Sequence, residues 1–499
     1  MIRRLLIANR GEIAVRIVRA CRDLGIETVA VYSDADRRAP HVRAADVAAH
    51  LGGSAPAESY LNVERLLAAA RTHEADAVHP GYGFLSERAH FARACRDAGL
   101  TFVGPPPEAI ERMGSKIGAR QLMEKTGVPV VPGETPLDQS DGALAAAVER
   151  VGFPALIKPS AGGGGIGMKT LRDRSDALDA IQRARREALS AFGDGTLYVE
   201  RLVERPRHVE VQVIADAHGH VVHGFERECS VQRRHQKVVE ESPCAALTPA
   251  VRERMGLAAV AAARAAGYVN AGTIEFLLEG DGDAARFFFL EMNTRLQVEH
   301  PVTELVTGID LVRAQLLIAG GDPLPWSQET LSQRGHAIEC RVYAEDPDRE
   351  FLPQAGPLLM YREPRGPGIR VDAGVAEGGE VSIFYDPLLA KLIVYGETRA
   401  AAIARAITAL EQFVILGIRT NIPFLLAILR HPRFQKAEID TSFLDRERDA
   451  LRTREADVPL AAFAAAAVHE SGATAAAPVG DMNRRGRDPF ETLQGWGLD

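Results

Sequence analysis

Residues 291–304, EMNTRLQVEHPVTE, place two carboxylates, an amide, an arginine, a glutamine and a histidine within ten positions. They follow directly on the apolar run at residues 287–290. Polar side chains launched in such number from a buried strand are typical of a binding or catalytic loop. The residue types suggest three tasks, which are holding a metal ion, binding a planar anion and accepting a proton.

A metal site is predicted by oxygen donors on two neighbouring strands. Alternate residues of a strand face one side, so Glu291 and Asn293 point together, and Glu275 on the preceding strand can join them. These hard ligands suit a Mg²⁺ ion that bridges nucleotide phosphates. The alternative is a pair of glutamates neutralised by a cation such as Arg295, and the strand pair alone does not decide between the two.

An anion site and a base are predicted immediately after these donors. Arg295 and Gln297 together can bind a planar anion. Glu299 can act as a general base if it lies within hydrogen-bond reach of a proton. The alternative for Glu299 is a helix cap, because PVTEL resembles the start of a helix.

A glycine-rich run, AGGGGIGMK at residues 161–169, predicts a phosphate-binding lid. Glycines leave the backbone N–H groups open and permit positive φ, so the loop can wrap phosphates closely. It is not a Walker A loop, and a flexible linker is the alternative. Lys158 before the run and Lys116 in MGSKIGARQLM could neutralise a polyphosphate, although a surface lysine is the simpler interpretation of Lys116.

The segment at residues 226–241, ERECSVQRRHQKVVEE, is basic in an acidic chain. It could be an anion site or a solvated face, and it contains Arg227, Gln232, Arg233, Arg234, His235 and Lys237. No H-E-x-x-H and no Cys/His spacing occurs, so we expect no zinc.

The elements that must position these residues alternate along the chain. RRLLIAN, ETVAVYS, ADAVHP and LTFVG are four predicted strands separated by helices, which indicates a parallel doubly wound sheet over roughly residues 1–113. The turn ANRGEIA lacks the G-x-G-x-x-G pattern, so a nicotinamide oxidoreductase is disfavoured. A small α/β module follows, then antiparallel strand pairs, then an α+β unit. Residues 450–499 are an Ala-rich tail of no legible function.

Composition narrows the class of protein. The chain has 499 residues, 46% of them hydrophobic and 25% charged, which suggests two to four soluble domains. A net charge of −8 disfavours nucleic acid, and no apolar run is long enough for a membrane span or a secretion signal. The five cysteines form no C-x-x-C pair, so a reducing cytoplasm is expected, with Cys229 as a buried spectator.

Eight ordered motifs resemble the biotin carboxylase family of ATP-grasp enzymes over about residues 1–445: ANRGEIA, HPGYGFLSE, MGSK, KPSAGGGGIGM, ERECSVQRRHQKVVEE, EMNTRLQVEHPVTE, GHAIECRVYAEDP and FYDPLLAKLI. The resemblance implies a multidomain fold of α/β and α+β type. Its domains are a Rossmann-like N-terminal domain at 1–113, an ATP-grasp domain at 114–330 with a mobile lid at about 131–203, and a C-terminal biotin carboxylase domain at 335–445.

The resemblance also implies the reaction. MgATP, or MnATP, phosphorylates bicarbonate to carboxyphosphate, which releases CO₂ and phosphate, and N1′ of biotin on a carrier protein is deprotonated and carboxylated. This is the first half-reaction of acetyl-CoA, propionyl-CoA, other acyl-CoA or pyruvate carboxylases. The chain has no Met-Lys-Met biotinylation centre, so we expect a separate biotin carboxyl carrier protein and carboxyltransferase. A cytoplasmic homodimer, with a role in fatty acid biosynthesis, is expected.

Site residues are implied position by position. The ATP site would comprise Lys116, Lys158, Gly162, Gly163, Gly164, Gly165, Gly167, Met168, Glu200, Arg201, Val203, His208, Gln232, His235, Lys237 and Leu277. Bicarbonate would meet Lys237, Arg295, Gln297, Val298 and Glu299; biotin would meet Tyr82 and Arg341; the metal would meet Glu275, Glu291 and Asn293. The catalytic residues would be Glu299, Arg341, Lys237 and Arg295. The family lid often carries Arg or Lys where this chain has Ile166, so only backbone contacts to phosphate are expected there.

Two other functions fit part of the pattern. A carbamoyl-phosphate synthetase-like or carboxylate–amine ligase would share the lysines and metal-binding glutamates but lack the R-x-Q-V-E string and Arg341. A scaffold or regulatory nucleotide binder would bind ATP without turnover, and Glu299 and Arg341 argue against it.

Overall fold

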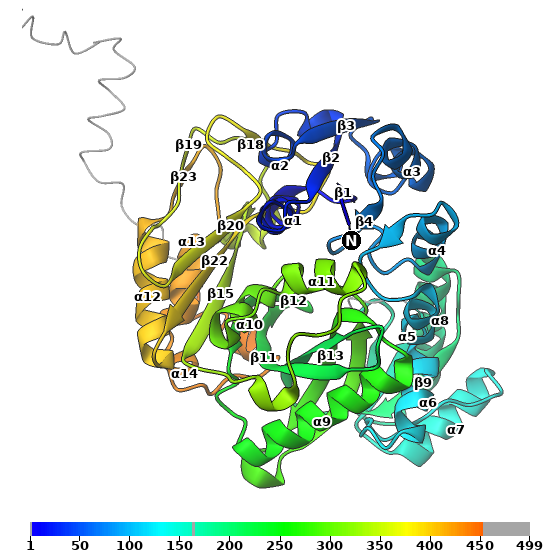
Figure 1. The fold of residues 1–499 in the computed structure, drawn as a ribbon. Helices are drawn as coiled ribbons and strands as arrows, with labels where there is room; N and C mark the ends of the chain where they lie inside the picture. The colour runs from blue at the N-terminus through cyan, green and yellow to red at the C-terminus, as the bar shows by residue number, and fades with distance from the viewer. Residues whose placement is uncertain (1, 162–164, 453–499) are drawn as a thin grey trace, which may run out of the picture. The chain divides into compact units, whose positions relative to one another are not determined.

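The computed structural model describes residues 2–161 and 165–452 (Figure 1). Gly162, Gly163 and Gly164 of the predicted lid, and all of the predicted tail from residue 453 onward, lie outside the described residues. No helix within these two ranges is both long enough and apolar enough to cross a membrane.

The N-terminal part is a parallel sheet of strand order β3-β2-β1-β4-β5. Its elements are β1 (Arg4–Ile7), α1 (Gly11–Asp23), β2 (Glu27–Ser33), α2 (Pro40–Ala44), β3 (Val47–Gly52), α3 (Val63–Thr72), β4 (Ala77–His79), α4 (Ala89–Asp97) and β5 (Thr101–Phe102). The central strand β1 is buried on both faces, as expected when helices cover a parallel sheet. The sequence predicted four of the five strands. It missed the edge strand β3, whose small residues carry little strand propensity.

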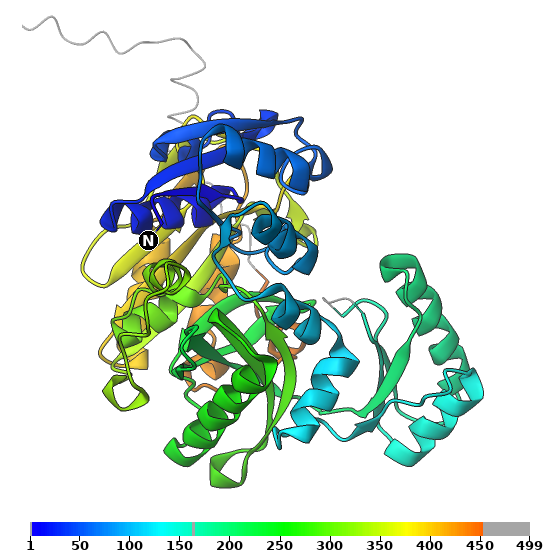
Figure 2. The same cartoon turned by 45° about the vertical axis from the view of Figure 1, so that its right-hand side comes forward.

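A small antiparallel sheet of order β6-β9-β7-β8 corresponds to the predicted module (Figure 2). Helices α5 (Pro107–Gly114) and α6 (Lys116–Lys125) lead into it. The module contains β6 (Gly133–Glu134), α7 (Asp141–Val151), β7 (Ala155–Pro159), β8 (Lys169–Leu171), α8 (Ala177–Phe192) and β9 (Leu197–Arg201). Both helices pack against the sheet around a core of its own.

An eight-stranded sheet of order β14-β13-β10-β11-β12-β15-β22-β20 forms the centre of the molecule. Its strands are β10 (Arg207–Ala215), β11 (Val221–Arg233), β12 (Gln236–Ser242), β13 (Asn270–Glu279), β14 (Arg286–Asn293), β15 (His336–Tyr343), β20 (Ile369–Ala373) and β22 (Leu388–Gly396). The antiparallel pairing of β12 with β15 joins residues on either side of the predicted domain limit near 330–335. The sheet is therefore continuous across that limit, which the sequence did not indicate.

The two faces of this sheet differ in chemistry. Apolar side chains face α9 (Pro249–Ala266) and α12 (Arg399–Gln412), which cover one side. On the other side, α10 (His300–Thr307) packs across β11, β12, β15 and β22. The side chains that alternate onto the α10 side are largely charged, and they hold the candidate site.

The remaining elements are short or peripheral. They are α11 (Leu311–Ala319), β16 (Glu345–Asp346), β17 (Leu352–Pro353), β18 (Gly356–Pro357), β19 (Met360–Arg362), β21 (Glu380–Val381), β23 (Val414–Leu416), α13 (Ile422–Arg430), α14 (Pro432–Gln435) and α15 (Phe443–Arg446).

Candidate active site

A row of charged side chains crosses the α10 face of the large sheet. The strand register sets Glu210 opposite both Glu275 and Arg227, Glu240 opposite Glu339, and Arg341 opposite Lys391. Residues directly opposite one another in antiparallel strands share a face. The row thus draws on neighbouring pairs of strands and is fixed by backbone hydrogen bonds.

A cavity of about 620 Å³ opens beside this row. Many of the residues predicted from the sequence line it together: Tyr82, His208, His235, Lys237, Glu275, Glu291, Asn293, Arg295, Gln297, Val298 and Arg341. These side chains come from segments separated by up to 259 positions along the chain, counted from residue 82 to residue 341. The predicted metal, anion and biotin residues therefore face one shared space.

The three predicted metal ligands lie together. Glu275 pairs directly with Glu291 across β13 and β14, and the Asn293 amide donates to Glu275 at 2.9 Å. The cation nearest to Glu291 is Lys116, at 3.9 Å. Burial and the charge of Glu275 raise the pKa of Glu291, as expected for two carboxylates that lack a shared cation. This donor set fits Mg²⁺ or Mn²⁺.

The alternative of a glutamate pair neutralised by Arg295 is not what the structure shows. The Arg295 guanidinium binds Glu87 at 3.0 Å and the Asn293 carbonyl oxygen at 2.8 Å. Two other clusters, His208–Glu210–Glu275 and Glu210–Cys229–Glu299, have a spacing that could hold a metal ion. The Lys237 ammonium already lies among their carboxylates, so Glu275 with Glu291 is the better metal site.

Lys237 is the cationic centre of the site. Its Nζ donates to Glu210 at 2.6 Å, to Glu275 at 3.0 Å and to Glu299 at 2.5 Å. Burial lowers the pKa of Lys237, but the acidic groups around it, Cys229 and Glu210 foremost, raise that pKa well above its usual value. The side chain is therefore a permanent positive charge beside the cavity.

Glu299 is fully buried at the N-cap position of α10, yet its side chain makes no capping hydrogen bond. It accepts instead from Lys237 and, at 3.0 Å, from Arg341. Burial favours the neutral acid, but Lys237 and Arg341 outweigh it and hold the pKa of Glu299 well below its ordinary value. The helix-cap alternative is thus wrong, and Glu299 is an ionised carboxylate between two cations.

Arg341 links Glu299 to a second buried carboxylate. Its Nε donates to Glu240 at 2.5 Å while its other arm contacts Glu299. Burial raises the pKa of Glu240 to about 7. Tyr82, which borders the same cavity, donates its hydroxyl to Glu12. A guanidinium held by carboxylates on both sides presents a fixed positive charge to the cavity.

The loop between β14 and α10 is anchored at several points. Glu87 accepts from the Thr294 N–H and the Arg295 side chain, both at 3.0 Å, and Gln297 accepts from Arg295 at 3.1 Å. The Val298 carbonyl accepts from the buried Lys391 at 2.7 Å. The Nε2 of Gln297 is buried and has no hydrogen-bond partner among the described residues, so a donor remains for an anion beside Arg295.

The predicted nucleotide residues form groups beside this cavity. Lys158 donates to Glu200 at 2.7 Å, and Arg120 donates to the same carboxylate at 2.8 Å. Val203 and Leu277 pack with Val131 and Phe288 in an apolar cluster. Arg201 pairs with Glu279 at 2.8 Å, and Gln232 lies opposite Lys237 in the β11–β12 pair.

The described end of the lid approaches the cavity. Gly165 has φ +77°, and a Cβ built on it would lie 2.4 Å from the ring of His235, so a larger residue does not fit. The Met168 N–H closes a turn onto the Gly165 carbonyl at 3.2 Å, while Gly167 also has positive φ and Ile166 is exposed.

The basic segment 226–241 is neither a single anion site nor a solvated face. His235 and Lys237 line the cavity, whereas Arg233 lies 3.9 Å from the ring centroid of Phe351 and Arg234 is exposed near Glu350. Arg227 is completely buried and fully partnered. Cys229 is buried, as predicted, with its thiol 4.0 Å from Glu299.

Several residues that shape the site were missed by sequence reasoning. They are Glu12, Glu87, Glu210, Arg227, Glu240, Glu339 and Lys391. A signal existed for some of them, because a charged residue in the middle of a strand is expensive to bury unless it is paired. Glu87 also ends the motif HPGYGFLSE, from which only Tyr82 was selected.

Three family models match the chain: "Biotin carboxylase, N-terminal domain" at residues 1–110, "Carbamoyl-phosphate synthase L chain, ATP binding domain" at 115–327 and "Biotin carboxylase C-terminal domain" at 339–446. The biotin carboxylase of Halalkalibacterium halodurans is 53% identical over 89% of this chain and 97% of its own length. The chain belongs to the biotin carboxylase family. The family resemblance and the predicted fold class are thereby confirmed, and so is the prediction of a biotin carboxylase enzyme.

Other biotin carboxylase relatives agree. A pyruvate carboxylase subunit of Methanothermobacter thermautotrophicus is 50% identical over 90% of both chains. The biotin carboxylase domain dimer of Hydrogenobacter thermophilus 2-oxoglutarate carboxylase, solved with MgADP, ADP and bicarbonate, is 43% identical with a TM-score of 0.87 and covers 91% of this chain and 100% of that one. The carbamoyl-phosphate synthase model matches the central ATP-binding segment alone, so the comparisons do not support the rival ligase. The domain limits and the residue roles remain predictions.

Proposed function

We propose that this chain uses MgATP and bicarbonate to carboxylate biotin on a carrier protein by way of carboxyphosphate. The observation that carries the proposal is the buried Glu299, held between Lys237 and Arg341 beside a cavity that also contains Glu275 and Glu291. One space therefore offers a proton acceptor, an anion site and a metal site. The Hydrogenobacter relative was solved with MgADP and bicarbonate, which are the product complex and the second substrate of this reaction.

ATP would lie between the lid and the large sheet. The adenine would pack against Val203 and Leu277, near Glu200 and Arg201, with the phosphates near Lys116, Lys158 and the lid from Gly162 to Met168. His208, Gln232 and His235 would contact the ribose and phosphates. Glu275, Glu291 and Asn293 would hold Mg²⁺ or Mn²⁺, which offsets phosphate charge during transfer.

Bicarbonate would bind Arg295, the free Gln297 amide and the Val298 backbone, close to Lys237. As a bicarbonate oxygen attacks the γ-phosphorus and ADP leaves, its proton passes to Glu299. In the ligand-free site the two cations make Glu299 a weak base. Bound anions compete for the same cations, so substrate binding raises the pKa of Glu299 and strengthens the base when it is needed.

Biotin would enter beside Tyr82 and Arg341. Carboxyphosphate releases CO₂ and phosphate, N1′ of biotin loses its proton, and the nitrogen attacks CO₂. The Arg341 guanidinium offsets the negative charge that develops on the ureido oxygen. Carboxyphosphate hydrolyses readily in water, so closure of the lid would protect it.

The finer assignments rest on the relatives and on the sequence. The relatives act in pyruvate, methylcrotonoyl-CoA and 2-oxoglutarate carboxylases, so the final acceptor here would be an acyl-CoA or a 2-oxo acid, with acetyl-CoA carboxylase in cytoplasmic fatty acid synthesis as the leading candidate. The absent Met-Lys-Met centre supports a separate carrier and carboxyltransferase. A homodimer is proposed because the Hydrogenobacter domain is a dimer.

The deciding assay is ADP release with bicarbonate, with and without free biotin. The proposal expects bicarbonate-dependent release that biotin stimulates. Ammonia-dependent release without biotin would support the rival ligase instead, and nucleotide binding without turnover would indicate a regulatory binder. Reconstitution with candidate carrier proteins then identifies the partner.

A further inference from the structure

We propose that Arg227 is a positioning residue of this site, which fixes Glu210 and helix α10 so that Lys237 and Glu299 are held together. The inference rests on the proposed function. Arg227 lies on β11, and neither its own side chain nor that of Glu210 has any exposed surface. It does not line the cavity, so its effect reaches the substrates only through other side chains.

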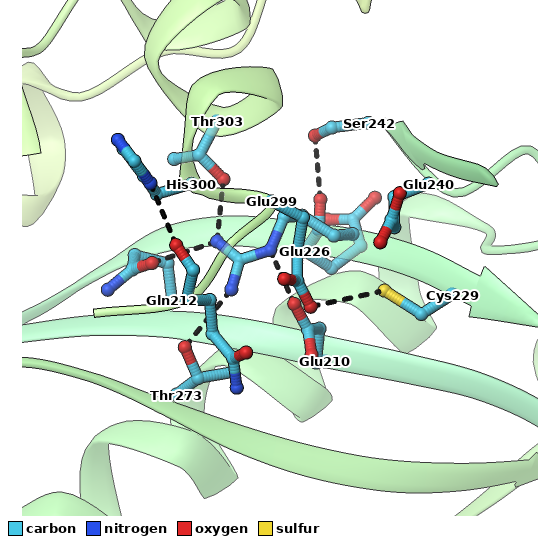
Figure 3. Close-up of polar contacts among 12 residues, drawn as sticks. Glu210, Gln212, Glu226, Cys229, Glu240, Ser242, Thr273, Glu299, His300 and Thr303 are labelled. Carbon is cyan, nitrogen blue, oxygen red and sulfur yellow. Dashed lines mark hydrogen bonds and ion pairs between the residues drawn. The ribbon is translucent and has the colours of Figure 1, made fainter. Parts of the chain in front are cut away.

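All the donor nitrogens of Arg227 are used. Its Nε donates to Glu210 at 2.5 Å, one terminal nitrogen donates to Gln212 at 2.8 Å and Thr303 at 3.0 Å, and the other donates to Thr273 at 3.0 Å. Figure 3 shows these four partners gathered around one guanidinium group. A lysine could replace the charge but not this planar fork of donors.

The first line of action runs through Glu210. One oxygen of this carboxylate accepts from Arg227, and the other accepts from the Lys237 ammonium at 2.6 Å. Lys237 in turn contacts Glu299 at 2.5 Å. The position of the ammonium is therefore set from the side remote from the cavity, by a charge pair that no solvent reaches.

The second line of action runs through α10. Thr303 lies one helical turn after Glu299, so its bond to Arg227 ties the start of the helix to β11. Gln212 and Thr273 tie the same guanidinium to β10 and β13. Both partners of the Lys237–Glu299 pair are thus located by one side chain.

The test is Arg227→Met (R227M) in the full chain, assayed by bicarbonate-dependent ADP release. Small displacements of catalytic groups cost about 100-fold, so we expect kcat to fall on the order of 100-fold. The KM for ATP should stay within about threefold, because the nucleotide residues keep their own contacts. A kcat within about threefold of wild type, or a KM that rises as much as kcat falls, would overturn the inference.

A double-mutant cycle with Glu210→Gln (E210Q) tests the route. If Arg227 acts through Glu210, R227M/E210Q loses no more activity than the worse single variant, whereas multiplied losses contradict the proposal. The double variant also removes both charges, which avoids an unpaired buried carboxylate. It therefore decides the matter if R227M alone does not fold.

A matched control is available on the same sheet. Arg399 pairs with the buried Glu241 at 2.6 and 3.0 Å, and Glu241 alternates to the opposite face of β12 from Glu240. R399M/E241Q should leave kcat within about threefold of wild type; losses equal to those of R227M/E210Q would reduce Arg227 to a stabilising residue and overturn the proposal. An inactive wild type would defeat the proposed function itself, whereas an active wild type with normal R227M defeats this inference alone.

Discussion

Replacing Glu299 with glutamine (E299Q) keeps the shape of the side chain and removes the charge that Lys237 and Arg341 contact. An amide cannot take the bicarbonate proton. We expect kcat for bicarbonate-dependent ADP release to fall about 10²- to 10⁴-fold, the usual range for loss of a general base. Affinity for MgATP should change by less than about threefold, because Glu275 and Glu291 remain.

The same substitution has a thermodynamic signature. Removing one partner of a buried ion pair costs about 3–5 kcal/mol. The folded-state pKa of Glu299 is depressed, so its contribution to stability is complete above the unfolded pKa of about 4.3 and is lost as pH falls through the folded value. The difference in unfolding free energy between wild type and E299Q should be largest at neutral pH and shrink below about pH 4.

Glu304→Gln (E304Q) is the control. Glu304 lies on the same helix, is buried, and pairs with Arg16 at 2.9 Å and Arg370 at 2.7 Å. E304Q should lose comparable stability in urea unfolding while kcat stays within about threefold of wild type. Wild-type turnover in E299Q, or equal loss of turnover in both variants, would refute the role of Glu299 as base.

Three further outcomes can be measured. Arg341→Ala should lower biotin carboxylation at least about tenfold more than bicarbonate-dependent ATP hydrolysis, and equal losses would contradict its role near biotin. Gly165→Ala places a methyl group 2.4 Å from the His235 ring at φ +77°, so the KM for ATP should rise several-fold with little change in Tm, and an unchanged KM would show that the lid need not approach there. Glu240 has a folded pKa of about 7, above the unfolded value of about 4.3, so the folded state keeps a proton that the unfolded state loses, and stability falls by up to about 3 kcal/mol as pH rises through this window. Glu240→Gln should remove that decline between pH 5 and 8 in urea unfolding, and an unaltered slope would refute the assignment.

The metal residues could be predicted because strand alternation is local. Glu291 and Asn293 are two residues apart, and the hairpin brings Glu275 opposite Glu291. The position of Lys237 could not be obtained this way. The turn before it has Arg234 and His235 at positive φ, where glycine or asparagine would mark a hairpin, and the β11–β12 register is irregular.

The contacts of Glu299 were also beyond local reasoning. The sequence left base and cap as alternatives, and the choice depends on Lys237 and Arg341, which approach from strands 62 and 42 positions away. Arg341 reaches it only because β12 pairs with β15. Such long-range pairing leaves no periodic trace in the sequence, which is why the continuous sheet was missed as well.

That continuity bears on how relatives can exchange parts. The joint between the ATP-binding and C-terminal segments is a seam of backbone hydrogen bonds from Val239–Ser242 to Ala337–Cys340. Glu240 and Arg341 stand on either side of that seam and bond across it. A graft that swapped the C-terminal segment would have to match the edge of a sheet as well as the lining of a pocket. Inheritance of this half as an intact block, rather than piecemeal, is the natural outcome.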